Sequence, residues 1–196
     1  MPGAIHPESL RFVQRPDKER LLGQKGLVIW LCGLSGAGKS TIAAALERVL
    51  HHQQVLTAVL DGDNLRAGLN ADLGFSDDDR LENIRRAAEV AAILASQGVV
   101  TIVSAITPRG ELRDLARGIL GHDFLEVYVK AAYATCRQRD PKGLYAKAEA
   151  GAIPMFTGRD SAFEEPHCPD LVLDTEHQSV EDCALELLEA VTPRIR

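Results

Sequence analysis

Between residues 33 and 41 the sequence reads Gly33-Leu34-Ser35-Gly36-Ala37-Gly38-Lys39-Ser40-Thr41. This stretch fits the phosphate-loop pattern G-x-x-x-x-G-K-S/T at every fixed position. The apolar run 27–32 before it is typical of a buried strand, and the Ala- and Leu-rich run 41–50 after it is typical of a helix. Between them, backbone N–H groups and the positive end of the helix would face an anion. The stretch therefore predicts a site for a nucleoside triphosphate with Mg²⁺.

Two side chains of this loop have separate expected roles. Lys39 is expected to reach the β- and γ-phosphates, and the Ser40 hydroxyl is expected to bind Mg²⁺. A chance glycine-rich turn is the alternative. Because the pattern counts only between a strand and a helix, the presence of both favours the phosphate loop.

The composition is typical of a globular protein. The 196 residues are 45% hydrophobic and 26% charged, which suits one domain with short appendages. We expect an N-terminal extension over 1–26 and a single domain over 27–196. A formal net charge of −6 argues against a nucleic-acid binder. Because the sequence shows no long apolar run, we expect no membrane association and a cytoplasmic location. The four cysteines lack metal or disulfide spacing, so we expect free thiols, most of them buried.

Strand and helix patterns alternate along the chain. Besides 27–32, strands are predicted at 55–60, 99–103, 124–129 and 170–173. Helices are predicted at 17–22, 79–97, 112–120, 132–139 and 180–191. This alternation predicts an α/β fold of the P-loop NTPase type, with a parallel sheet and helices on both faces. Ligands of such sheets bind beyond the carboxyl ends of the strands.

Two segments, 61–79 and 140–169, do not follow the alternation. The second is long for a connection in a compact domain. It contains the large apolar residues Leu144, Tyr145, Met155, Phe156 and Phe163. A disordered insert is the alternative, but a solvated segment would be less apolar, so we favour a lid over 140–169.

Two carboxylates follow the second predicted strand, in the run Asp61-Gly62-Asp63. This topology places them at the carboxyl edge of the sheet, beside the phosphate loop. Phosphoryl transfer needs a carboxylate that orients or accepts the proton of the attacking hydroxyl. Either aspartate could serve, or could hold Mg²⁺ through water. An Asx turn after a strand is the structural alternative.

Further polar and aromatic candidates lie just downstream. Arg80 and Asn83 share a face of a predicted helix and together can grip a phosphate, a sulfate or a ribose hydroxyl. For Arg85 and Arg86 we favour a solvated or ion-paired face. Phe75, in a polar loop, is interpreted as a platform for a base or as a plug of the core.

Several specific motifs follow the phosphate loop in order. They are Leu60-Asp61-Gly62-Asp63-Asn64-Leu65-Arg66, Leu73-Gly74-Phe75-Ser76, Asp140-Pro141-Lys142-Gly143-Leu144-Tyr145 and Phe156-Thr157-Gly158. With them the chain resembles the adenylylsulfate kinase family over residues 18–191. Members of this family use ATP to phosphorylate the 3′-hydroxyl of adenosine 5′-phosphosulfate (APS). The products are ADP and 3′-phosphoadenosine 5′-phosphosulfate (PAPS).

The resemblance implies a role for each candidate residue. The residues implied in catalysis are Lys39, Asp61, Asp63 and Thr107. Those implied in binding ATP are Arg139 and the phosphate loop from Gly33 to Thr41, and those implied in binding Mg²⁺ are Ser40 and Asp61. Those implied in binding APS are Asp63, Arg66, Phe75, Arg80, Asn83, Ile106, Lys142, Leu144, Phe156 and Thr157. The resemblance also implies a homodimer, a place in sulfate assimilation and a functional link to ATP sulfurylase.

The chain departs from the family's pattern after its third predicted strand. Where the family usually reads S-F-I-S-P-Y-R, this chain reads Ser104-Ala105-Ile106-Thr107-Pro108-Arg109-Gly110. Thr107 keeps the hydroxyl of a serine that is proposed to form a phosphoenzyme in some members, although direct in-line transfer needs no such intermediate. The changed segment motivates one alternative, a related kinase with another nucleotide acceptor. The other alternative is a nucleotide-binding regulator without catalysis.

Overall fold

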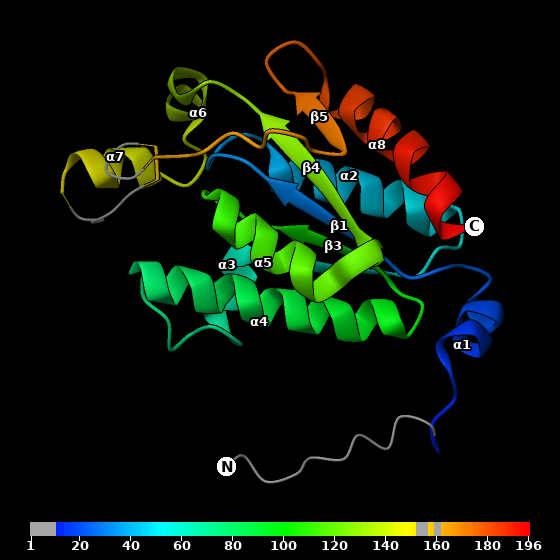
Figure 1. The fold of residues 1–196 in the computed structure, drawn as a ribbon. Coiled ribbons are helices and arrows are strands. Elements are labelled where there is room, and N and C mark those ends of the chain that lie inside the picture. Colours follow the sequence, from blue (N-terminus) through cyan, green and yellow to red (C-terminus); the bar gives the residue numbers. More distant parts are fainter. Residues whose placement is uncertain (1–10, 152–156, 159–161) are drawn as a thin grey trace, which may run out of the picture.

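The computed structural model describes residues 11–151, 157–158 and 162–196 (Figure 1). Its strands form one parallel sheet in the order β2-β3-β1-β4-β5. They are β1 (Leu27–Cys32), β2 (Thr57–Asp61), β3 (Val100–Ser104), β4 (Phe124–Lys130) and β5 (Leu171–Asp174). The expected α/β fold is confirmed, and each strand lies within about two residues of its predicted bounds.

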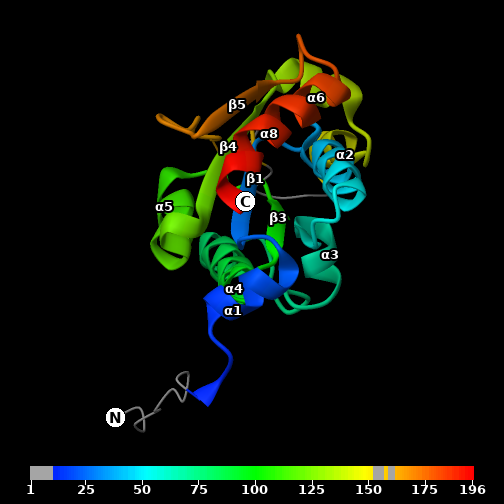
Figure 2. The same ribbon diagram turned by 90° about the vertical axis from the view of Figure 1, so that its right-hand side faces the viewer.

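Helices cover both faces of the sheet, as expected. On one face lie α2 (Lys39–His52) and α8 (Val180–Ile195), and on the other lie α4 (Asp77–Ser96) and α5 (Gly110–Leu120). Figure 2 shows the same arrangement after a quarter turn, with α2 and α5 on opposite sides of the strands. Because all the strands are parallel, their carboxyl ends meet at one edge, where the segments after β1, β2 and β3 become neighbours.

β1 occupies the middle of the sheet, and all of its residues are buried. Ile29 and Leu31 enter the core that α2 covers, whereas Val28 and Trp30 enter the core that α4 covers. A strand buried on both faces has a continuous apolar sequence, which is why the run 27–32 was recognisable.

α4 begins at Asp77 because Ser76 and Asp79 form a capping box. Ser76 Oγ accepts a hydrogen bond from the Asp79 N–H at 3.1 Å, and the Asp79 carboxylate accepts one from the Ser76 N–H at 3.3 Å. These contacts satisfy N–H groups that the first turn leaves unpaired. The cap fixes the start of the helix that carries Arg80 and Asn83.

Two short helices lie inside the segments that the sequence left irregular. α3 (Gly62–Ala67) follows β2, and the Asp61 carboxylate caps its start. α7 (Leu144–Glu149) begins where the Asp140 carboxylate accepts hydrogen bonds from two backbone N–H groups of the first turn. Helices of fewer than two turns show no readable apolar period, so the sequence pattern could not reveal them.

α1 (Arg15–Leu22) lies at the amino end of the strands, opposite α6 (Tyr133–Arg139) and α7 (Figure 1). Its Arg15 donates hydrogen bonds to the Asp123 carboxylate at 2.5 and 2.7 Å. Gln24 Nε2 donates to the Gly98 carbonyl oxygen at 2.8 Å. The segment around α1 is therefore fastened to the amino edge of the sheet.

The cysteines are all free thiols, as expected: Cys32, Cys136 and Cys183 are buried, and Cys168 is exposed. Burial raises the pKa of Cys32 to about 12, which keeps this thiol protonated. In the ranges that the structure describes, no helix has the length and apolar character needed to cross a membrane.

Candidate active site

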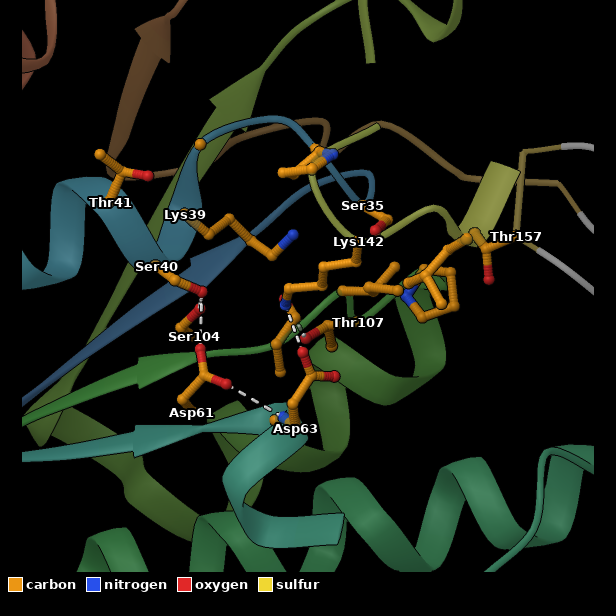
Figure 3. A pocket seen from close by; sticks show the side chains of 18 of the residues that line it. Ser35, Lys39, Ser40, Thr41, Asp61, Asp63, Ser104, Thr107, Lys142 and Thr157 are labelled. Carbon is orange, nitrogen blue, oxygen red and sulfur yellow. Dashed lines mark hydrogen bonds and ion pairs between the residues drawn. The ribbon is translucent and has the colours of Figure 1, made fainter. Parts of the chain in front are cut away.

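A cleft of about 640 Å³ opens at the carboxyl edge of the sheet (Figure 3). The structure brings together in its lining most of the residues expected from the sequence: Ser35, Gly36, Gly38, Lys39, Ser40, Thr41, Asp61, Asp63, Arg66, Phe75, Arg80, Asn83, Ile106, Thr107, Arg139, Lys142, Leu144 and Thr157. Segments far apart in the sequence therefore meet at one cavity. Phe156, which was also expected here, lies outside the described residues.

Two glycines and a local hydrogen bond shape the backbone of the phosphate loop. At Gly33, where φ is 147°, an added Cβ would lie 2.3 Å from a backbone oxygen of β4. At Gly36, where φ is 77°, it would lie 2.9 Å from a backbone oxygen of α6. The Leu34 carbonyl accepts a hydrogen bond from the Ala37 N–H at 3.2 Å and closes the turn. Only glycine fits at positions 33 and 36, because any side chain there would collide with the backbone.

Lys39 is buried at the start of α2, with its ammonium directed into the loop. Nζ donates hydrogen bonds to the carbonyl oxygens of Gly33 at 2.9 Å and Leu34 at 2.8 Å. Burial lowers the pKa of Lys39 to about 8, because desolvation disfavours the charged form. A phosphate placed in the loop would stabilise that charge.

Three oxygen-bearing side chains converge beside the loop (Figure 3). Ser40 Oγ donates to Asp61 Oδ2 at 2.6 Å and lies 3.2 Å from Ser104 Oγ. Burial acts to raise the pKa of Asp61, but hydrogen bonds from Ser40 and from the Asp63 N–H outweigh it and hold the pKa below its usual value. An ionised carboxylate with hydroxyl oxygens fits Mg²⁺, which prefers oxygen ligands.

The segment after α6 contacts two sides of the cleft. Lys142 Nζ forms an ion pair with Oδ2 of Asp63, a residue that lies two positions after the end of β2 (Figure 3). Tyr145 Oη donates to the Ser35 carbonyl oxygen of the phosphate loop at 2.8 Å. This one segment therefore links the loop to the carboxylates.

Two guanidinium groups line the part of the cleft formed by α3 and α4. Arg66 lies over the Phe75 ring, with Cζ 4.4 Å from the ring centroid, and donates to the Gly74 carbonyl oxygen at 2.9 Å. Arg80 donates to the Phe75 carbonyl oxygen at 3.1 Å and to Thr157 Oγ1 at 2.8 Å. Partial burial lowers the pKa of both arginines, because each guanidinium has lost part of its hydration. A bound oxyanion could replace that lost water.

The interpretation of Phe75 as a core plug is wrong, because the residue is 50% exposed. Asn83, in contrast, is buried at the cleft wall, where its Oδ1 accepts a hydrogen bond from Asn70 Nδ2 at 2.9 Å. The ion-paired interpretation of Arg85 and Arg86 is confirmed. Both pair with Glu82, and Arg86 also pairs with Asp72.

Arg139 connects α6 to the residue that follows β5. Its Nη1 donates to Thr175 Oγ1 at 2.9 Å, and its Nη2 donates to the Thr175 carbonyl oxygen at 2.6 Å. Thr175 Oγ1 in turn donates to the Ala37 carbonyl oxygen of the phosphate loop at 2.9 Å. Sequence reasoning missed Thr175 and Ser104. Their position at or just beyond the carboxyl end of a strand is the signal that could have found them.

The segment 104–110, which departs from the family's pattern, forms another wall of the cleft. Ala105 places a methyl group where the family has an aromatic ring, and it lines the cleft beside Ile106. Arg109 forms ion pairs with Asp77 at 3.3 Å and with Glu111 at 3.0 Å. The shifted arginine is thus held at the start of α4.

Residues 25–174 match the family model described as adenylylsulphate kinase. The chain is 52% identical over 190 residues to an adenylyl-sulfate kinase of Phocaeicola vulgatus, covering 96% of this chain and 93% of the relative. It is 55% identical over 168 residues to an adenylyl-sulfate kinase of Bacillus licheniformis, covering 85% of each chain.

Solved structures agree with these sequence matches. The APS kinase of Mycobacterium tuberculosis in complex with AMPPNP and APS superposes with a TM-score of 0.83 at 48% identity. That match covers 86% of this chain and 98% of the other. A hexameric APS kinase from Thiobacillus denitrificans gives a TM-score of 0.67 at 25% identity, covering 98% of this chain and 34% of the other. Because the family model matches most of the chain and full-length relatives are about half identical to it, the chain belongs to the adenylylsulphate kinase family.

Proposed function

We propose that the chain transfers the γ-phosphoryl group of ATP to the 3′-hydroxyl of APS by direct in-line displacement, yielding PAPS and ADP. The observation that carries this function is the meeting of two anion sites in one cleft. Lys39 and the phosphate loop form one site, and the guanidinium groups of Arg66 and Arg80 form the other. Such a cleft can hold a triphosphate donor and an anionic acceptor together, which is the main requirement of phosphoryl transfer.

On the donor side, the loop N–H groups and Lys39 hold the β- and γ-phosphates, and Arg139 binds at the nucleotide end. Ser40 and Asp61 hold Mg²⁺. When bound there, the ion would offset the negative charge of the phosphate oxygens. Lys39 then keeps its proton, because a phosphate replaces the solvation that burial removed, and it stabilises charge on the transferring group.

On the acceptor side, Arg66 and Arg80 hold the phosphosulfate, because planar guanidinium groups bind oxyanions through paired hydrogen bonds. The exposed part of the Phe75 ring stacks against the adenine, with Phe156 proposed on its other face. The remaining acceptor contacts are Asn83, Ile106, Leu144 and Thr157.

Asp63 orients the 3′-hydroxyl and accepts its proton as the oxygen attacks phosphorus. Its ion pair with Lys142 joins the base to the lid over 140–169, so lid closure also aligns the carboxylate. Asp61 stays on the metal side through its hydrogen bond with Ser40. Thr107 needs no covalent role in this displacement.

The family resemblance supports four further proposals: a cytoplasmic location, a homodimer, a functional link to ATP sulfurylase, and one domain over 27–196 behind an N-terminal extension. Light scattering on the full chain tests the homodimer. A mass of two chains supports it, and a mass of one chain or six chains contradicts it.

The direct test is ADP release with ATP and Mg²⁺, in the presence and absence of APS. A panel of other adenine and cytidine nucleotides serves as the control. We expect stimulation by APS alone, because the correct acceptor completes the site and closes the lid. Stimulation by another nucleotide would support the alternative acceptor instead. ATP binding without turnover in any of these mixtures would support the other alternative, a nucleotide-binding regulator without catalysis.

A further inference from the structure

The backbone of residues 105–107 is joined directly to β1 and to the phosphate loop. The Ala105 N–H donates to the Leu31 carbonyl oxygen at 3.1 Å. The Gly33 N–H, at the first position of the phosphate loop, donates to the Ile106 carbonyl oxygen at 3.1 Å. Residues 105–107 therefore form a wall on the acceptor side of the cleft, and two backbone hydrogen bonds fix the position of this wall relative to the phosphate loop.

Thr107 at the end of this stretch has an unusual backbone. Its φ is 46°, a left-handed conformation that a β-branched residue rarely adopts. Such a conformation persists only where neighbouring groups hold it. Here Trp30 Nε1 donates to Thr107 Oγ1 at 2.9 Å, and Arg113 Nη1 donates to the Thr107 carbonyl oxygen at 3.0 Å. Both the side chain and the backbone of Thr107 are therefore fixed.

The arginine that holds Thr107 is itself fixed from the core. Arg113 is only 5% exposed on α5, and its Nε lies 3.2 Å from Glu126 Oε1 on β4. Glu126 is equally buried, and it also pairs with the more exposed Arg117. A guanidinium can contact a carbonyl and a carboxylate at once because its donors form a rigid planar fork.

We propose that Trp30, Thr107, Arg113 and Glu126 form a positioning network, here termed the Thr107 network, that sets residues 105–107 against the acceptor. Thr107 then acts on the reaction through the position of Ile106 and not as a phosphoryl carrier. Thr107 is 1% exposed, and its hydroxyl accepts the Trp30 hydrogen bond and lies 3.4 Å from the Ala105 carbonyl oxygen. This inference rests on the proposed function, because its kinetic test needs APS as the acceptor.

Thr107→Val keeps the shape of the side chain but removes the acceptor of the Trp30 hydrogen bond. We expect kcat/KM for APS to fall about 100-fold, as a small misplacement of a substrate-binding wall can cause, with KM for ATP unchanged. Thr107→Ser keeps the hydroxyl and should restore most of this loss. Thr101→Val is the matched control, since Thr101 is buried on β3 and its Oγ1 makes no hydrogen bond within the described residues. The control should keep the normal kcat/KM.

Fluorescence tests the Trp30–Thr107 contact without any substrate. Trp30 is the single tryptophan of the chain and is fully buried, so emission excited beyond the absorption of the tyrosines reports on its indole alone. Loss of the acceptor in Thr107→Val should shift the emission maximum, and Thr101→Val should leave it in place. If wild-type protein fails to use APS, the proposed function fails. If wild-type protein uses APS and Thr107→Val behaves normally, only the present inference fails.

Arg113→Lys provides a second variant in case Thr107→Val does not fold. A single ammonium cannot reproduce the fork that contacts Thr107 and Glu126, so the same APS-specific loss is expected. Equal losses for ATP and APS would show a general structural role and overturn the proposal. Covalent phosphate on Thr107 after wild-type protein is incubated with radiolabelled ATP would overturn it as well.

Discussion

The donor and acceptor halves of the cleft are built in opposite ways. The centre of the donor half is one continuous run, 33–41, whose shape follows from backbone that approaches β4 and α6 too closely for any side chain at Gly33 or Gly36. The acceptor half is assembled from several elements, and its side chains are oriented by distant partners. Arg80, for example, is held by Thr157, which lies 77 residues further along the chain.

This difference predicts how each half responds to change. A site made of backbone groups around one buried cation should fail almost completely when that cation is lost. A site made of several side chains, each with its own partner, should lose affinity in steps. Four measurements test this contrast, beginning with the largest expected effect.

Lys39→Ala should reduce turnover by at least about 10³-fold, because it removes the buried cation that faces the transferring phosphate. The fold should survive, since the wild-type ammonium is desolvated and satisfied only by loop carbonyls. Steady-state ADP release and circular dichroism check the two parts. A variant that retains more than a tenth of the wild-type rate would contradict the backbone-and-cation description of the donor half.

Arg80→Ala should weaken APS binding by roughly 2–5 kcal/mol, the loss typical of a desolvated partner of an anion. ATP affinity should stay the same, because Arg80 lines the acceptor side of the cleft, where it donates hydrogen bonds to Phe75 and Thr157. Calorimetric titration with each nucleotide separates the two effects. Arg85→Ala is the matched control on the same helix, because Arg85 pairs with Glu82 outside the cleft. Weaker binding of both ATP and APS to Arg80→Ala would contradict the division of the cleft into donor and acceptor halves.

The same contrast explains what the sequence could predict. The phosphate loop at the centre of the donor half lies in consecutive residues, so a local pattern revealed the strand, the loop and the helix together. Asp61, Asp63 and Arg80 were found because each follows a strand or starts a helix at the carboxyl edge. Residues in the acceptor half owe their orientation to contacts across the fold, and no spacing in the sequence encodes those contacts.

The buried charges beneath the acceptor half illustrate what the sequence could not predict. Charged residues are expected on the surface, yet Arg113 and Glu126 are both nearly inaccessible and face each other. The left-handed backbone of Thr107 is equally invisible, because threonine normally favours extended structure. Such features follow from how α5 packs on β4, which only the folded chain reveals.

The pKa of Lys39 gives the donor half a pH signature. Its pKa is 10.5 in the unfolded reference and about 8 in the folded chain, so the unfolded state binds the proton more tightly. The side chain therefore opposes folding at pH 7, and this penalty should shrink by about 1 kcal/mol between pH 7 and pH 9. Urea unfolding of wild type and Lys39→Met at both pH values measures it. The stability advantage of the variant should narrow at pH 9, and a constant advantage would contradict the burial of a charged lysine.

The smallest effect concerns the segment that contacts both halves. Tyr145→Phe removes the hydrogen bond to the Ser35 carbonyl and should cost about 1 kcal/mol, or about fivefold in KM for ATP. KM for APS should stay the same, because Lys142 still pairs with Asp63. Tyr133→Phe is the control, as the Tyr133 ring packs edge to face on Tyr145 and needs no hydroxyl for that contact. If both KM values rise together, α7 acts on both halves of the cleft as one body, and the division into donor and acceptor halves does not extend to α7.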